Sequence, residues 1–219
     1  VATHNSMIAS RLNLNNVLWI TEAGVKSLSG VDEKVANFFV RADDNGFLQL
    51  LLSKKVFLVE GATEFLLLPH FYQQITGKSI EEDGISVISC NGISYKKYLE
   101  IAEKTDKKIA VITDNDKEQE KINFANKYNE ENTLQHIYMA DSTDDWTWEI
   151  CMYNVNQAVL DKMIKVQAGA EYKYHGESYG AVPGKMLNNK VDVAYQMLTS
   201  GTVFEIPQYV KDAIEWLRK

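Results

Sequence analysis

The sequence has too little cysteine, proline and basic charge for several common classes of protein. Its two cysteines, Cys90 and Cys151, cannot build a disulfide framework, so a reducing, cytoplasmic location is expected. Three prolines and 12 glycines are too few for a fibrous or low-complexity chain. Apolar runs such as 65–68 fall far short of the roughly 18 residues that cross a bilayer, so we expect no membrane contact. The net charge of −7 argues against a dedicated, basic nucleic-acid binder.

The remaining composition suits a globular protein. With 219 residues, 45% of them hydrophobic, the chain can form one compact domain with extra elements, or one domain and part of another. The start, from Val1 to Asn5, has neither the basic nor the apolar part of a signal peptide. Because the first residue is not Met, we expect the chain to be part of a longer protein.

The middle of the chain alternates strands and helices. Short apolar runs predict strands at 55–59, 85–89, 108–113 and 136–140, and helices are predicted between them at 63–74, 95–104 and 118–129. Pro69 should kink the first of these helices or end its first part. The β-α-β-α-β-α-β order predicts an α/β fold, with a parallel sheet covered by helices on both faces.

The flanking segments are more helical. A strand is predicted at 17–21, and helices are predicted at 33–41, 47–53, 148–165, 191–198 and 208–218. The segment from Gly169 to Gly184 is rich in glycine and tyrosine and is predicted to be a long loop. This loop could contact DNA, cover a site or simply connect two helices, and the sequence does not decide.

Acidic residues follow three of the predicted strands. These residues are Glu60 and Glu64 after the first strand, Asp114 and Asp116 after the third, and Asp141, Asp144, Asp145 and Glu149 after the fourth. Ligands of open parallel sheets bind at these strand ends. Any one group could be a helix cap or a turn. Three groups at one edge would repel one another unless cations joined them, and oxygen ligands favour Mg²⁺ or Mn²⁺.

Four segments resemble a known family. Val59-Glu60-Gly61-Ala62-Thr63-Glu64 resembles the glutamate signature of TOPRIM domains in the form found in OLD-family nucleases. Ile112-Thr113-Asp114-Asn115-Asp116 resembles the Asp-x-Asp strand end of the same domains. Thr147-Trp148-Glu149 resembles a later Thr-x-Glu segment, whose central residue is commonly Leu, and Lys185 in Pro183-Gly184-Lys185 resembles the catalytic lysine of the family.

The N-terminus carries a further resemblance. Val1-Ala2-Thr3-His4-Asn5-Ser6 is similar to the switch-histidine segment of ABC-type ATPase domains, with Asn5 where Ser is usual. OLD proteins place such an ATPase before the TOPRIM domain. The resemblance therefore implies an ATPase remnant and linker at 1–50, a Rossmann-like TOPRIM core at 51–145, and the completion of that domain with a helical C-terminal extension at 146–219.

The resemblance also implies a function. A metal-dependent DNA endonuclease would use Glu60, Asp114, Asp116 and Lys185 in catalysis, and would hold two Mg²⁺ or Mn²⁺ ions with Glu60, Glu64, Asp114, Asp116, Thr147 and Glu149. The sequence contains no glycine-rich phosphate-binding loop, so ATP would act only through the missing part of the ATPase domain. Besides DNA, the expected partners are further copies of the chain, as a homodimer or larger homo-oligomer, and a protein or nucleic acid of an anti-phage defence system. Gabija-type and retron-associated nucleases are related.

Three alternatives remain open. A haloacid-dehalogenase-type phosphatase also uses Asp-x-Asp, but its motif follows the first strand, and Glu118 stands where that family has Thr or Val. A topoisomerase would need a nucleophilic tyrosine, and 11 tyrosines are present. A catalytically silent TOPRIM domain would only bind DNA or a partner.

Overall fold

The fold is built on a four-stranded parallel sheet. The computed structural model describes residues 16–21, 24–41, 46–92, 94–167 and 170–219. The strands are β3 (Lys55–Val59), β4 (Ile85–Ser89), β5 (Lys108–Ile112) and β6 (Gln135–Tyr138), in the order β4-β3-β5-β6. Val59 pairs with Ser89 on one side and with Ile112 on the other. The carboxyl ends of these strands therefore lie at one edge, and the predicted parallel sheet is confirmed.

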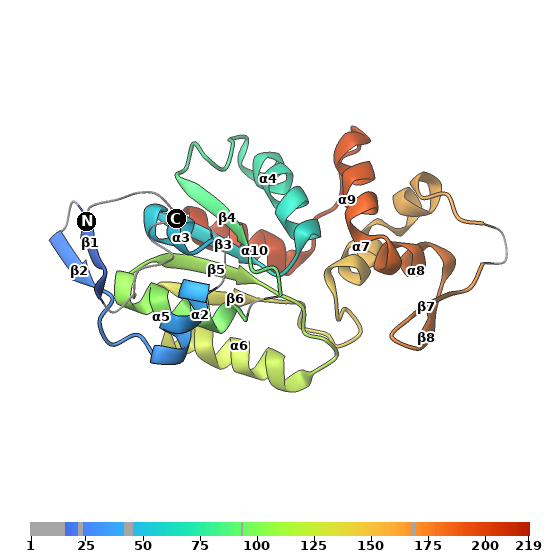
Figure 1. Ribbon diagram of the computed structural model, residues 1–219. Coiled ribbons are helices and arrows are strands. Elements are labelled where there is room, and N and C mark those ends of the chain that lie inside the picture. The colour runs from blue at the N-terminus through green and yellow to red at the C-terminus, as the bar shows by residue number, and fades with distance from the viewer. Residues whose placement is uncertain (1–15, 22–23, 42–45, 93, 168–169) are drawn as a thin grey trace.

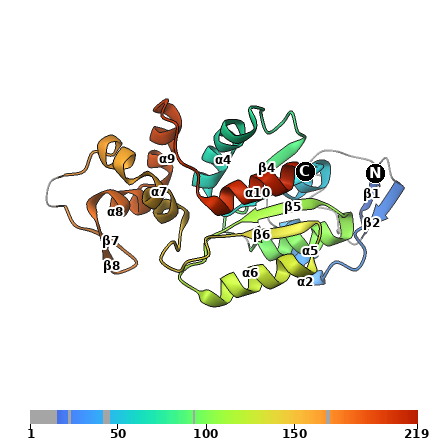
Figure 2. The ribbon, with the colours of Figure 1, turned by 180° about the vertical axis from the view of Figure 1, so that it is seen from behind.

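Helices cover both faces of the sheet (Figures 1 and 2). Helices α4 (Ala62–Thr76) and α10 (Gln208–Arg218) lie on one face, and α5 (Tyr95–Thr105) and α6 (Gln119–Glu131) lie on the other. Because side chains alternate along a strand, Phe57 and Val59 of β3 enter the first apolar core, whereas Val56 and Leu58 enter the second. The two cores explain why the strands are nearly continuous apolar runs.

The N-terminal part adds a hairpin and two helices. Strand β1 (Leu18–Thr21) pairs antiparallel with β2 (Gly24–Ser27), and α2 (Glu33–Arg41) and α3 (Gly46–Leu52) follow. The predicted strand and both predicted helices are confirmed, although the second strand of the hairpin was not predicted. The segment that resembles an ATPase, with His4, lies outside the described residues.

The C-terminal part forms a lobe beyond the carboxyl edge of the sheet (Figure 1). It contains α7 (Trp148–Met163), β7 (Tyr172–Tyr174), β8 (Glu177–Tyr179), α8 (Ala181–Asn188) and α9 (Lys190–Thr199). The prediction of a single long loop from 169 to 184 was wrong, because β7 and β8 form an antiparallel hairpin and α8 begins at Ala181. After α9 the chain returns to the sheet as α10, on the same face as α4.

Three local features depart from simple helix and strand rules. Helix α4 continues through Pro69, so of the two outcomes expected for this proline, an end to the first part of the helix does not occur. Helix α7 is interrupted at Asn156, whose side-chain amide donates to the Glu205 carbonyl at 2.8 Å and accepts from the Glu205 N–H at 2.8 Å. Along the edge strand β6, the side-chain amide of Asn129 pairs in the same way with both backbone groups of Ile137.

No helix in the described segments is both long and apolar enough to cross a membrane.

Candidate functional site

Carboxylates from three separate segments gather at the carboxyl edge of the sheet. Glu60 directly follows β3 and Asp114 follows the neighbouring strand β5. Their strands are adjacent, so one Glu60 oxygen accepts hydrogen bonds from the Thr113 hydroxyl at 2.8 Å and from the Asp114 N–H at 3.2 Å. Glu64 lies in the first turn of α4, and Glu149 lies in the first turn of α7. Glu60 and Asp114, which follow the first and third predicted strands, therefore lie next to each other, as the sequence analysis expected.

Thr147 links two of these acids. Its hydroxyl oxygen lies 2.6 Å from Asp114 Oδ2 and 2.9 Å from Glu149 Oε2. A hydroxyl has one proton and can donate to only one carboxylate, so the second contact requires a proton on a carboxyl group or a cation nearby. The other Asp114 oxygen accepts the N–H of Trp148 at 2.9 Å, at the start of α7. Asp114 is thus held at the N-terminus of α7, where a negative charge is favourable.

The gathered acids change one another's proton affinity. Burial, followed by the charges of Glu149 and Glu60, raises the pKa of Glu64 to about 7. Burial, followed by the charge of Glu64, raises the pKa of Asp114 well above its usual range. Both shifts mean that the site disfavours further negative charge and would gain from a bound cation. The cluster is therefore electrostatically suited to a cation.

A lysine that the sequence analysis did not select supplies part of the positive charge that the acid cluster favours. Lys190, the first residue of α9, places its ammonium 2.8 Å from Glu149 Oε2. Burial alone would lower the pKa of Lys190, but Glu149 and Asp114 nearby leave it raised, so the group stays charged. No sequence motif pointed to Lys190, because only the fold of the C-terminal lobe brings it to the acids.

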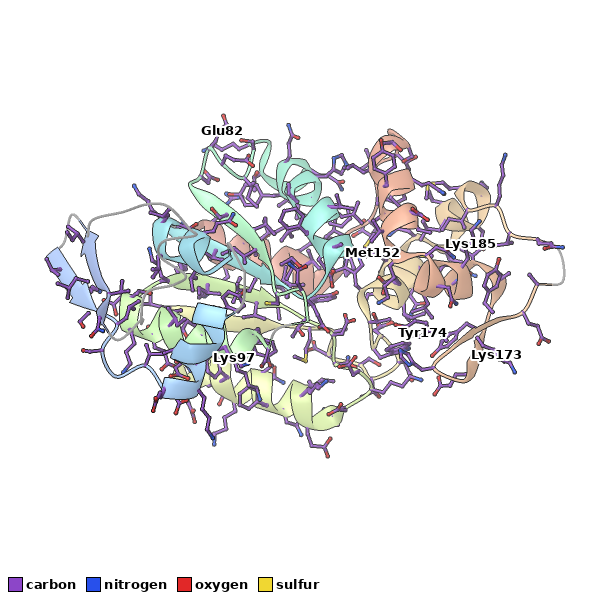
Figure 3. The ribbon with its side chains drawn as sticks, viewed as in Figure 1. Glu82, Lys97, Met152, Lys173, Tyr174 and Lys185 are labelled. Carbon is purple, nitrogen blue, oxygen red and sulfur yellow. The ribbon has the colours of Figure 1, made fainter. Side chains whose placement is uncertain are left out.

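Two predicted site residues make other contacts. Asp116 is exposed and forms an ion pair with Lys121 of α6, rather than facing Glu64 and Glu149. Lys185 lies on α8 in the C-terminal lobe (Figure 3), and its ammonium donates to the Lys165 carbonyl at 2.6 Å. Their roles in metal binding and catalysis stay predictions.

Asn115, between the two motif aspartates, is a positioning residue that the sequence analysis missed. It is buried, and its side-chain NH₂ donates to the carbonyls of Ala140 at 3.1 Å and Ser142 at 2.9 Å. These bonds fix the segment that leads from β6 to Thr147 and Glu149. The sequence offered one signal for this role. Side chains alternate in direction along an extended segment, so Asn115 is expected to point away from Asp114.

The present side-chain positions do not form a ready metal cage. Within the described ranges, no three His, Cys, Asp or Glu side chains are arranged to hold a metal ion. The contacts give a reason, because Glu149 is engaged by Lys190, and both Asp114 oxygens accept hydrogen bonds. The donor set nevertheless fits a hard divalent cation, since it offers only carboxylate and hydroxyl oxygens.

A parallel sheet with a glutamate after one strand and an Asp-x-Asp pair after its neighbour defines a TOPRIM-type α/β module. The family comparison gives the narrower assignment: residues 51–116 match the model described as "Overcoming lysogenization defect protein-like, TOPRIM domain". Residues 51–116 are therefore similar to the TOPRIM domain of OLD-like proteins. Such a domain is a metal-binding module of the nuclease type.

One solved structure agrees with the fold, and a second is similar over a comparable share of the chain. The C-terminal region of the Burkholderia pseudomallei OLD protein superposes with a TM-score of 0.51 at 15% identity, covering 76% of this chain and 98% of that chain. The C-terminal region of the Xanthomonas campestris pv. campestris OLD protein gives a TM-score of 0.44 at 16% identity, covering 76% and 95%. No curated protein matches the chain by sequence.

Proposed function

We propose that this chain is the nuclease module of a DNA endonuclease that hydrolyses phosphodiester bonds with Mg²⁺ or Mn²⁺. The observation that carries the proposal is the convergence of Glu60, Glu64, Asp114 and Glu149 at one edge, with the pKa of Glu64 raised to about 7. Acids so crowded cost stability unless they serve a cation. Their oxygens, with Thr147, would hold the metal, and Asp116 would join them after leaving Lys121.

The residues of the site would divide the work of hydrolysis. When bound, divalent cations supply an activated water and stabilise the leaving oxygen. Thr147 and the Trp148 N–H orient Asp114, and Asn115 holds the segment that carries Thr147. The Lys190 ammonium would move from Glu149 to the phosphate and offset the charge that develops there.

Cleavage of a supercoiled plasmid by the full chain tests the proposal. Nicking or linearisation with Mg²⁺ or Mn²⁺ should disappear with a chelator. Asp114→Ala should reduce cleavage by at least about 100-fold, as expected for loss of a group that stabilises the transition state. Asp141→Ala, which removes an exposed acid from the next strand end, is the matched control and should cleave normally. Full metal-dependent cleavage by Asp114→Ala would overturn the proposal.

Two lysines compete for the catalytic assignment. The resemblance points to Lys185, whereas the ion pair with Glu149 favours Lys190. We expect Lys190→Ala to lose cleavage and Lys185→Ala to keep it, with both variants folded by circular dichroism. The opposite result would return the role to Lys185 and require that α8 moves when substrate binds.

A catalytically silent domain is the second candidate. It is favoured by the absence, in the described segments, of a three-residue metal cage and by the neutralisation of Glu149 by Lys190. Such a domain would still bind cations and DNA. A metal-induced rise in Tm without cleavage of plasmid, duplex or single-stranded DNA would support it over the nuclease.

The wider context is also a proposal. In a longer protein, an ABC-type ATPase segment containing His4 would precede this module, and its ATP state would control access of DNA. A homodimer or larger assembly would suit an ABC-type ATPase, and the resemblance to OLD-family nucleases is the basis for proposing a role in anti-phage defence. ATP-dependent cleavage by the longer protein, lost on His4→Ala, would support the coupling.

A further inference from the structure

A cavity of about 570 Å³ opens beside the carboxylates, on the face of the sheet covered by α5 and α6. Glu60 and Asp114 form its border with the acid cluster, and Cys90, Val111 and Met139 form an apolar floor. Tyr95 from α5 and Phe124 from α6 supply aromatic rings to its walls. Glu64, Glu149 and Lys190 belong to α4, α7 and α9, so the cavity is a separate space that shares one rim with the cluster.

The charges around the cavity select against an anionic occupant. Its lining includes Glu60, Asp114, Asp116, Glu118 and Glu120, against two lysines, Lys96 and Lys121. Lys121 is already paired with Asp116 and lies 3.3 Å from Glu118. A phosphate inside the cavity would therefore be repelled, whereas a neutral ring with N–H donors would find acceptors. The volume is within the range of pockets that hold small organic groups.

The aromatic walls suit a flat ring. Phe124 is 41% exposed, so part of its ring is accessible to a ligand. The Lys96 ammonium lies 4.5 Å from the centre of the Phe124 ring and forms no ion pair with any described residue. The Tyr95 hydroxyl has no hydrogen-bond partner among the described residues, although Glu60 and Lys121 are near enough to influence its pKa. An exposed ring and an unpartnered hydroxyl therefore face the same space.

We propose that the cavity receives one unpaired nucleobase of the DNA strand whose phosphodiester lies at the carboxylates. The base would pack on Phe124 and hydrogen-bond to Tyr95, and Lys96 would contact a neighbouring phosphate at the mouth. The inference rests on the proposed function, because it takes the phosphate at Glu60 and Asp114 as the point of cutting. It adds a substrate class: DNA that is single-stranded, or unpaired next to the cut.

Binding of single-stranded DNA tests the pocket separately from cleavage. A fluorescent oligonucleotide of about 12 nucleotides, within the usual range for single-strand binding sites, is titrated with the full chain in Ca²⁺ and followed by anisotropy. The Phe124→Ala variant should bind the oligonucleotide about tenfold more weakly, because it loses the stacking of one base. Tyr95→Phe should weaken it less, because only the hydroxyl is removed. Phe65→Ala on α4, which removes a ring that is 45% exposed, is the matched control and should bind normally.

Oligonucleotides with one abasic position locate the base. When the abasic site is moved along the oligonucleotide, one position should weaken binding to the unsubstituted chain. At that same position, the abasic site should not weaken binding to the Phe124→Ala variant, because the contact is already lost. Equal binding by Phe124→Ala and the unsubstituted chain, or insensitivity to every abasic position, would overturn the pocket even if the chain cleaves plasmid. If binding depends on one base but no cleavage depends on Asp114, the pocket is supported and the proposed nuclease activity is contradicted.

Discussion

At the scale of single residues, the acid cluster makes stability depend on pH in an unusual direction. The pKa of Glu64 is raised from 4.5 to about 7, so the folded chain binds a proton that the unfolded chain has lost in this interval. The free energy of unfolding contributed by this group is therefore greatest below pH 4.5 and falls as pH rises to about 7, by about 3 kcal/mol. The raised pKa of Asp114 acts with the same sign.

Glu64→Gln should remove the Glu64 part of this dependence. In chelator, urea unfolding of the unsubstituted chain should lose more stability between pH 5 and pH 8 than unfolding of the variant, because glutamine carries no charge to desolvate. At pH 8 the variant should be the more stable protein. Glu120→Gln, in the exposed first turn of α6, is the control and should follow the unsubstituted chain. Parallel pH profiles for Glu64→Gln and the unsubstituted chain would contradict the assignment.

Trp148 is the second residue whose environment allows a specific prediction. It is 1% exposed and stacks on Phe71, yet its indole N–H has no hydrogen-bond partner in the described part of the chain. Trp148→Phe should change the free energy of unfolding by less than about 1 kcal/mol, because the smaller ring also removes a buried unpaired donor. Trp148→Ala should cost about 3–5 kcal/mol. Equal losses in the two variants, measured by urea unfolding, would show that the indole N–H is satisfied.

Single-residue roles were predictable only where a residue sits in a local motif. Glu60, Glu64 and Asp114 follow strands that could be recognised from apolar runs, so their meeting was foreseeable. Lys190 and Asn115 were not found, because their roles depend on which carbonyl or carboxylate the fold brings near. The contacts of Lys185 and Asp116 could not be foreseen for the same reason.

At the scale of elements, the β7–β8 hairpin was the main surprise. Its strands have three residues each, which is too short for an alternating pattern to be recognised. Its turn uses His175 and Gly176 with φ of 49° and 84°, the two positive values of a tight hairpin turn, but without the usual Asn-Gly pair. In helix α4, by contrast, a sequence signal for disruption was present but the helix continues, because its burial against the sheet outweighs the cost of Pro69.

Gly184 determines how closely the hairpin packs on α8. A Cβ at this position would lie 2.3 Å from the Tyr172 Cβ, far inside contact distance. Gly184→Ala should therefore cost about 1–3 kcal/mol and loosen the hairpin, with faster tryptic cleavage after Lys173. Gly180→Ala is the control, because its Cβ would meet Pro183 at an ordinary 3.5 Å. Unchanged proteolysis in Gly184→Ala would contradict this packing argument.

At the scale of the whole molecule, the acid cluster joins the sheet to the C-terminal lobe. Glu60 and Asp114 belong to the sheet edge, and Glu149 and Lys190 belong to the lobe. The sheet, its order of strands and its two covered faces were predictable from apolar periodicity. The arrangement of the lobe was not, because its helices carry no pattern that specifies which surface they pack against.

A cation shared by the sheet and the lobe should stabilise both together. Mg²⁺ or Mn²⁺ at about 100 times its Kd should add about 2.7 kcal/mol and raise Tm in a single transition, and chelator should reverse the rise. The rise should be larger at pH 8 than at pH 6, because Glu64 must lose its proton to act as a ligand. Asp114→Asn should abolish most of it. An equal Tm with and without the metal at pH 8 would argue against a cation at the carboxyl edge of the sheet.

The Asn129 side chain has a consequence for how copies of the chain can meet. By occupying both the N–H and the carbonyl of Ile137, it acts as a short mimic of a neighbouring strand along β6. An incoming strand could pair with Ile137 only after displacing this side chain. Strand-to-strand association along β6 would therefore begin by breaking these two hydrogen bonds.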